Sequence, residues 1–206
     1  MKTYLTIILT LSIHVLLTSQ VAISARYVTN NSSPWDMAFE DQDVLNSGVE
    51  IGIGYWFRFK GVRLEYLPEL SYTAFSSDKV DAKSYNAQFN VLIYALDFYS
   101  DCGTCPTFSK DGGLFKKGFH WILSPGASFI RGTSQSIAPA NSPEASTFRL
   151  GLGAGVDIGF SNLFTITPFA MYNIGQKGLF EEAEDSRFNQ FHLGLRGILR
   201  FDRNKW

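Results

Sequence analysis

Two histidines and one serine have the side chains best suited to acid–base or nucleophilic chemistry in this sequence. His120 and Ser124 lie in GFHWILS, and His192 lies in FNQFHLG. A hydrolytic site needs such groups to converge with a third, orienting residue. In an extended chain all three fall on a polar face, where their ordinary role is hydrogen bonding inside a filled interior. Nothing in the sequence resembles a nucleophile elbow or a metal-ligand cluster. We therefore predict that the protein is not an enzyme and has no cofactor.

Charged residues of both signs form the second group of interest, because they recur at alternate positions. In GVEIGIGYWFRFKGVRLEYLPEL, apolar residues alternate with charged or small ones. A hairpin folded about Lys60-Gly61 would put Arg58 opposite Arg63, with Glu65 placed to bridge both arginines. Charges enclosed in a protein interior need such compensation. We predict an internal charge network of Glu50, Arg58, Arg63, Glu65, Glu69, Arg149, Asp157, Arg196 and Arg200.

Strands must position these side chains, because their spacing follows the period of two of an extended chain. The pattern recurs in segments of roughly 10 to 14 residues, longer than an ordinary strand and close to the ~9–11 residues of a tilted membrane strand. Seven segments show it, namely 48–59, 62–75, 84–98, 118–130, 147–160, 164–173 and 188–201. Bacterial single-chain barrels have an even number of strands. QVAISARYVT, at 20–29, is the candidate for an eighth. The fold prediction is all-β: an eight-stranded antiparallel up-and-down transmembrane β-barrel.

The direction in which the apolar face points separates two architectures. A secreted lipocalin-like soluble barrel turns that face inward around a ligand, whereas an outer-membrane barrel turns it towards lipid. Glycines on the polar face suit a narrow bore, and aromatic residues near the ends of the apolar face are typical of interfacial girdles. A Lys or Arg on a lipid-facing wall costs about 2–4 kcal/mol at mid-depth. In a membrane, the charged face must therefore line the bore.

The N-terminus and the overall composition limit the classes of protein to which the chain can belong. The chain has 206 residues with a net charge of −1, which gives no indication of nucleic-acid binding. MKTYLTIILTLSIHVLLTSQ has a basic start and a short apolar core, the layout of a secretory signal peptide. Cleavage could follow Ser19 or Ser24, and only the first leaves 20–29 intact as a strand. We predict a signal peptide at 1–19 and one barrel domain at 20–206.

Several stretches resemble a known family. GYWFRFKGVRLEYLPELSY, LSPGASF, TPFAMYN and the terminal FDRNKW resemble small outer-membrane β-barrels of the OmpA/OmpX-like superfamily, in the style of the Bacteroidota porin family and its PorT-like members. DCGTCPTFSKDGGLFKKGF is similar to uncharacterised members of that group. A terminal aromatic residue, here Trp206, is typical of substrates of the barrel-assembly machinery, although LGLRGILRF departs from the usual terminal signal. The resemblance implies a multi-pass barrel in the Gram-negative outer membrane.

A periplasmic C-terminus would put long loops near 30–46, 75–83, 131–146 and 174–187 outside the cell. Tight turns would then lie at Lys60-Gly61 and Ser161-Asn162, and a long periplasmic segment at 100–118. That segment contains Cys102 and Cys105, for which an oxidising compartment favours a disulfide. A redox site would need a helical context, and a zinc site more ligands.

The expected role follows from the loops and the outer surface of the barrel. We predict that the 100–118 segment, with Lys116 and Lys117, either docks a periplasmic partner or caps the bore. The expected function is that of a structural or accessory subunit of an outer-membrane complex for secretion, uptake or assembly. The alternatives are a narrow channel, a binder of small hydrophobic ligands, or the soluble lipocalin-like barrel. Outer-membrane lipids and proteins of such a complex are the expected partners.

Overall fold

The computed structural model describes residues 20–32, 47–58, 63–76, 80–97, 114–134, 144–161, 163–175 and 188–200. The long strands are β1 (Gln20–Ser32), β2 (Ser47–Arg58), β3 (Leu64–Ser76), β4 (Val80–Ile93), β5 (Phe119–Ser134), β6 (Glu144–Val156), β8 (Phe164–Gly175) and β9 (Phe188–Arg200). A short strand, β7 (Ile158–Gly159), follows β6 after Asp157. The other elements in the described part of the chain are a 3₁₀ turn, η1 (Ala95–Asp97), and a five-residue helix, α3 (Leu114–Gly118). The predicted signal peptide at 1–19 lies outside the described residues.

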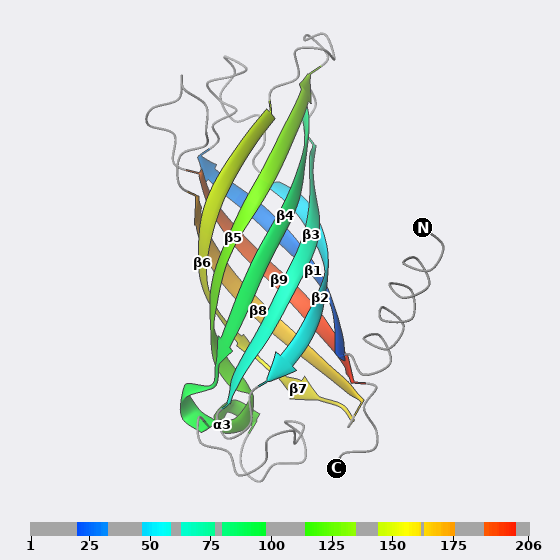
Figure 1. Cartoon of the computed structure of the whole chain (residues 1–206), viewed down its shortest axis with the longest axis vertical. Helices are drawn as coiled ribbons and strands as arrows, with labels where there is room; N and C mark the ends of the chain where they lie inside the picture. The colour runs from blue at the N-terminus through cyan, green and yellow to red at the C-terminus, as the bar shows by residue number, and fades with distance from the viewer. Residues whose placement is uncertain are drawn as a thin grey trace, which may run out of the picture.

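The strands form one closed antiparallel wall (Figure 1). Each long strand pairs with its neighbours in sequence, β1 pairs with both β2 and β9, and β6 pairs with β8. Because β7 pairs with the same neighbour as β6, the two form one side of the wall, which therefore has eight sides. The structure confirms the predicted eight-stranded up-and-down barrel. The eighth strand is the predicted 20–29 segment, extended to Ser32.

Side chains alternate between the bore and the outer surface along every long strand, as the period of two dictates. In β2, Ile51 and Ile53 are exposed and Glu50 is fully buried. In β9, Leu193 and Leu195 are exposed, whereas His192 and Arg196 are buried. The outer surface is thus apolar and the polar face is enclosed. This is the reverse of a lipocalin-like soluble barrel, so that alternative is wrong for this chain.

Glycines on the polar face make room for larger side chains in the narrow bore. A Cβ added to Gly151 of β6 would collide with the side chains of Asn173 and Met171. One added to Gly155 would lie 2.8 Å from His120 Nε2. The glycine-rich side of β6 therefore lets side chains from neighbouring strands fill the space next to it.

The β2–β3 hairpin has a different register from the predicted one. Arg58 lies opposite Glu65, and Phe57 lies opposite Tyr66, so the prediction of Arg58 opposite Arg63 is wrong. The two-residue shift keeps every side chain on its predicted face. It also replaces a pair of like charges with an ion pair and stacks the rings of Phe57 and Tyr66, whose centroids are 5.2 Å apart.

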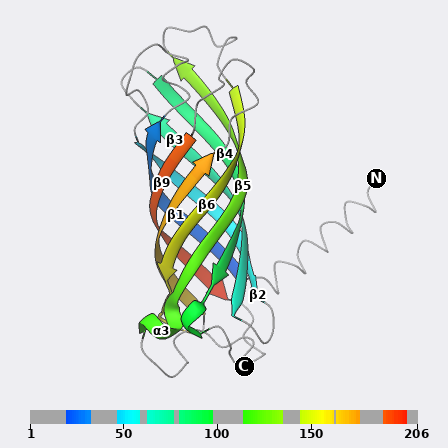
Figure 2. The ribbon, with the colours of Figure 1, turned by 90° about the vertical axis from the view of Figure 1, so that its left-hand side faces the viewer.

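The chain leaves the wall at the end where α3 lies, seen at the base of Figures 1 and 2. The alternation predicted a strand that continues to residue 98. In the structure β4 ends at Ile93, and the chain then turns through η1. None of the helices among the described residues is long and apolar enough to cross a membrane. At the opposite end β3 reaches Ser76 and β4 begins at Val80, so most of the predicted loop at 75–83 is strand.

Candidate functional site

The middle of the bore contains an arginine that contacts two carboxylates. Arg26 Nη1 lies 3.2 Å from Glu50 Oε1, and Arg26 Nη2 pairs with Glu69 Oε1. Ser24 donates a hydrogen bond of 2.8 Å to Glu69 and accepts one of 3.0 Å from Arg26. All four residues are buried. Arg26 was not part of the predicted network, although it stands on the polar face of the 20–29 strand. Its pairing across the bore could be seen only once that strand had closed the barrel.

Hydroxyl groups complete the surroundings of Glu50. Ser71 Oγ donates to one carboxylate oxygen at 2.7 Å, and Thr73 Oγ1 donates to the other at 2.8 Å. Asn86 donates to Thr73 Oγ1 at 2.9 Å and makes a longer contact of 3.4 Å with Glu50. His192 Nδ1 is 3.9 Å from the same carboxylate. The charge of Glu50 is thus compensated by one close arginine and by donors from two further strands.

A second cluster surrounds Glu65 near the α3 end. Trp56 Nε1 donates to Glu65 Oε2 at 2.7 Å, and Glu65 Oε1 lies 3.8 Å from Arg58 and 3.9 Å from Arg63. Glu65 therefore bridges both arginines even though the register differs from the predicted one. The Tyr94 hydroxyl lies 2.9 Å from Glu65 and 2.5 Å from Asp157 Oδ2, and its single proton can be donated to only one of them at a time.

Burial, together with the carboxylates of Asp157 and Glu65, raises the pKa of Tyr94 well above the ordinary value of a phenol. The tyrosine therefore stays protonated and acts as a neutral donor between two acids. Thr167 Oγ1 donates to the other oxygen of Asp157 at 2.5 Å. The predicted residues Glu65 and Asp157 are thus joined through Tyr94, which the sequence showed only as one polar-face residue among many.

Arg63 links η1 and α3 at this end of the bore. Its Nη1 donates to Asp97 Oδ2 of η1 at 2.5 Å and also to the main-chain carbonyl of Lys117 in α3. Its guanidinium lies 4.0 Å from the centre of the Tyr94 ring. The Asp157 amide donates to the Gly118 carbonyl at 3.0 Å, which ties the end of α3 to the wall. One buried arginine therefore links the wall, the 3₁₀ turn and the short helix.

Arg149 and Arg196 are buried without a carboxylate at hydrogen-bonding distance among the described residues. Arg149 Nη2 donates to Gln88 Oε1 at 2.8 Å. Arg196 lies 4.8 Å from the centre of the buried Phe169 ring, and Arg26 lies 5.5 Å from the same ring. An aromatic ring within about 6 Å attracts a guanidinium group, so Phe169 is favourable for both cations. The predicted residues thus lie in several contact groups along the bore, and the side chain of Arg200 is not among the described ones.

The candidate catalytic side chains are buried and are not hydrogen-bonded to one another. His120 Nδ1 contacts the Gly118 carbonyl at 3.1 Å, and His192 Nε2 contacts Gln190 Oε1 at 3.3 Å. Within the described residues, Ser124 Oγ has no hydrogen-bond partner. The structure therefore does not join the serine to either histidine as a nucleophile–base pair.

The two predicted docking lysines belong to α3 and differ in exposure. Lys116 is exposed on α3, whereas Lys117 is half-buried and its carbonyl accepts the hydrogen bond from Arg63. Cys102 and Cys105 lie outside the described residues, so their pairing stays a prediction. Exposed apolar residues lie near this end: Leu96, Phe115, Phe160 and Leu163.

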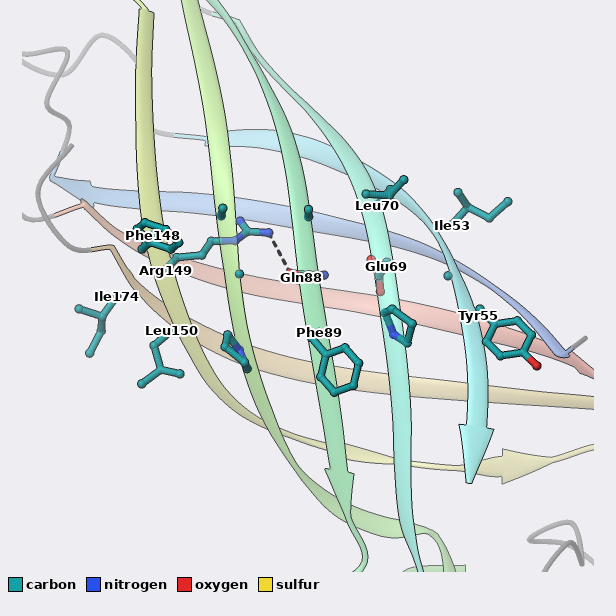
Figure 3. A pocket seen from close by; sticks show the side chains of 16 residues that line it. Ile53, Tyr55, Glu69, Leu70, Gln88, Phe89, Phe148, Arg149, Leu150 and Ile174 are labelled. Carbon is teal, nitrogen blue, oxygen red and sulfur yellow. Dashed lines mark hydrogen bonds between the residues drawn. The ribbon is translucent and has the colours of Figure 1, made fainter. Parts of the chain in front are cut away.

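The outer wall has a hollow that spans β2 to β6 and reaches Ile174 of β8, and the sequence pattern did not indicate it. We call it the wall hollow. Its volume is about 1100 Å³, and its small outward residues are Pro68, Ala87, Pro125 and Ala127. Figure 3 shows flanking residues such as Phe89 and Leu150, and it draws the bond between Arg149 and Gln88. Small side chains at matching heights on adjacent strands produce the hollow, and this matching depends on register.

Comparisons with known proteins bear on the fold. No protein-family model matches the chain, and neither does any curated protein. Among solved structures, Neisserial surface protein A has a TM-score of 0.54 at 14% identity and covers 89% of this chain and 97% of its own. The N-terminal β-barrel domain of Pseudomonas aeruginosa OprF has a TM-score of 0.48 at 15% identity and covers 87% of this chain and 97% of its own. The attachment invasion locus protein Ail of Yersinia pestis has a TM-score of 0.44 at 15% identity and covers 88% of this chain and 99% of its own. The likeness to Neisserial surface protein A shows that the chain has the eight-stranded β-barrel fold found in small outer-membrane proteins.

Proposed function

We propose that this protein is an integral β-barrel of the Gram-negative outer membrane. The observation that carries the proposal is the apolar outer wall on all eight sides, with exposed residues such as Ile51, Phe148 and Leu195. Among the strand residues whose side chains the structure describes, outward charge is confined to Asp81, Lys83 and Arg131 near one end. Soluble monomers rarely expose apolar patches larger than a few hundred Å². Hydrocarbon is the solvent that such a wall suits, and a closed barrel leaves no unpaired edge within it.

The bore supports a role as a rigid support rather than as an open pore. Eight strands leave room for side chains alone. Here that room holds the Arg26 and Glu65 clusters, and Arg63 links η1 and α3 at one end. A narrow channel would require these buried contacts to open. This filled interior therefore favours a protein that acts through its ends and its outer wall.

We further propose that the protein is not an enzyme and serves as a structural or accessory subunit of an outer-membrane complex. The burial of His120, His192 and Ser124 supports the first part, because a substrate would have to enter the filled bore to reach them. The exposed Lys116 and the neighbouring Phe115 on α3 support the accessory role, because they form a surface at which a periplasmic partner could bind. The similarity to the Bacteroidota porin family and its PorT-like members stays a prediction from sequence.

Electrophoretic mobility after mild and full denaturation tests the membrane barrel directly. Full-length protein folded in detergent or lipid should migrate differently before and after boiling, and in cells it should fractionate with the outer membrane. A chain that remains soluble without detergent and shows one unshifted band would contradict the proposal.

Co-purification from native membranes tests the accessory role, with wild type compared with Lys116→Glu. The expected result is a defined partner whose recovery falls in the variant while the mobility shift of the barrel is unchanged. Equal recovery of the same partner in both would remove α3 as the docking surface. Phospholipid hydrolysis by the folded barrel would overturn the non-enzymatic assignment.

A further inference from the structure

The wall hollow lies over the middle of the strands that line it. Ala87 and Ala127 lie opposite each other in the middle of β4 and β5. In the next row of outward residues there are two prolines, Pro68 of β3 and Pro125 of β5. These four residues have short side chains, so the surface is indented where they meet. Large apolar side chains border the indentation, and Figure 3 labels several of them, namely Tyr55, Leu70, Phe89, Phe148 and Leu150.

Main-chain groups form the floor of the wall hollow. Glu69, Gln88 and Arg149 line it, although their side chains are buried and hydrogen-bonded inside the bore. It is therefore their peptide groups that face the hollow. The short side chains around this floor cover the peptide groups less than the large side chains do elsewhere on the wall.

The strand pairing beneath the wall hollow identifies one carbonyl that lacks its donor. The β2–β3 register lacks the pairs of Leu67 and Pro68, whereas the β3–β4 register includes both residues. In an antiparallel sheet a residue directs its N–H and its C=O to the same neighbouring strand, and proline has no N–H. The break therefore lies on the side that Pro68 faces. Continuing the register from Gly54–Glu69 by one residue puts Tyr55 there, so the Tyr55 carbonyl has no N–H opposite it.

A second carbonyl lacks its donor between β4 and β5, nearer the centre of the hollow. The β4–β5 register lacks the pairs of Ser124 and Pro125, whereas the β5–β6 register includes both residues. By the same reasoning Pro125 faces β4, and continuing the register from Gln88–Gly126 by one residue puts Phe89 opposite it. The Phe89 carbonyl therefore also has no N–H opposite it. It lies in the row next to the two alanines.

Side chains do not replace the missing donors within the described part of the barrel. The side-chain amide of Asn90 donates from the bore to a different carbonyl, that of Leu67, at 3.1 Å. No described side chain donates to Tyr55 or Phe89. Hydrocarbon contains no water that could do so, and an unpaired carbonyl there is unfavourable. The wall hollow thus combines an apolar surface with two acceptors that only a donor from the lipid phase can satisfy.

We propose that the wall hollow binds a hydroxylated acyl chain, with the hydroxyl donating to the carbonyl of Phe89 or Tyr55 and the hydrocarbon packing against Ala87 and Ala127. This inference rests on the proposed membrane insertion, which keeps water away from the wall. A hydroxyl supplies the missing donor without bringing a charge into hydrocarbon. Because the hollow lies at mid-strand, about 15 Å of hydrocarbon separates it from either surface, so a headgroup cannot reach it. The hydroxyl must therefore be carried within the chain.

The test uses full-length protein in phosphatidylcholine vesicles that contain equal amounts of three fatty acids. These are 12-hydroxyoctadecanoic acid, 12-oxo-octadecanoic acid and octadecanoic acid. With the carboxylate at the headgroups, carbon 12 lies near the middle of the bilayer. The hydroxyl can donate and accept, the oxo group can only accept, and the third chain can do neither. Native mass spectrometry of protein released from the bilayer identifies the retained acid by its mass.

One double variant removes the need for an external donor. Pro68→Ala with Pro125→Ala restores both N–H groups to the sheet and keeps the side chains short. Its matched control is Pro168→Ala, which changes a proline of the β8 wall outside the hollow. Wild type and the control should retain one molecule of the hydroxy acid, with a preference of about fivefold over each of the other two, the contribution of one hydrogen bond. The double variant should retain the three acids equally.

A second double variant removes the space. Ala87→Leu with Ala127→Leu fills the indentation and should retain none of the acids. Its matched control is Ala25→Leu, at an exposed wall position of β1, which should behave as wild type. If the leucine pair does not fold, the proline pair decides the question alone.

Retention of none of the acids by wild type, or of the hydroxy and oxo acids equally, would overturn the proposal. The same preference for the hydroxy acid in the proline pair as in wild type would also overturn it. A dimer mass or a co-released protein in place of the acid would overturn it in favour of a protein occupant. The mobility shift on boiling is measured on every sample, and its absence in wild type would instead refute membrane insertion.

Discussion

Replacement of Arg26 by methionine is the sharpest test of the bore, because this one cation contacts two buried carboxylates. The variant leaves Glu50 and Glu69 buried close to each other without their shared arginine. Breaking a buried ion pair by removing one partner costs about 3–5 kcal/mol. Since two acids lose their partner, we expect Arg26→Met to lower the free energy of unfolding by about 5 kcal/mol, the upper end of this range. Glu50→Gln should cost about 3 kcal/mol, because Glu69 still compensates Arg26 and the amide oxygen can still accept from one hydroxyl.

A double variant measures the interaction between Arg26 and Glu50 apart from the contacts that each makes with other groups. Because Arg26 contacts Glu50, the double variant Arg26→Met with Glu50→Gln should be more stable than the sum of the single effects predicts, by about 2 kcal/mol. The assay is equilibrium unfolding by denaturant of the barrel in detergent micelles or thin vesicles, followed by tryptophan fluorescence and by mobility on unboiled gels. Single effects below about 1 kcal/mol, or strict additivity, would refute the buried network as described.

Other substitutions test other parts of the structure. Tyr94→Phe removes the donor shared by Asp157 and Glu65, and unfolding measurements should show a loss of about 1–3 kcal/mol. Gly151→Val should overpack the bore beside Asn173 and cost about 1–3 kcal/mol in the same assay, whereas a neutral result would mean that the bore has unused space. Ile51→Arg should cost about 2–4 kcal/mol in bilayers and Ile51→Ala less, and equal effects would argue against a lipid-facing wall.

The alternation along the strands was sufficient to predict the architecture, because a period of two assigns each residue to one of two faces and survives errors of register. The β2–β3 hairpin illustrates this: its register is shifted by two residues, yet Glu65 still reaches both Arg58 and Arg63. The even number of strands led to β1, which carries Arg26. The sequence did not show which residues across the bore Arg26 would contact, because that depends on closure between β1 and β9.

Features that depend on matching heights between strands could not be predicted. The wall hollow requires Ala87 and Ala127 to share a row and two prolines to lie in the next one. Lys83 was assigned to a loop because SSDKVDAK is polar, whereas β4 begins at Val80 and puts this lysine on the outer wall. Tyr94 looked like one more polar-face residue of a long strand. Its position between Asp157 and Glu65 depends on the chain leaving the wall after Ile93, and the alternation does not predict where a strand ends.

The central claim is that the apolar wall meets hydrocarbon, and spin-label accessibility measures it most directly. A nitroxide at Leu195→Cys, near the middle of β9, is compared with one at Lys83→Cys, in vesicles and with both native cysteines replaced by serine. The wall label should be much more accessible to oxygen than to a water-soluble nickel complex, and the label at residue 83 should show the reverse. A label at residue 195 that the nickel complex reaches as readily as the one at residue 83 would contradict the membrane orientation of the barrel.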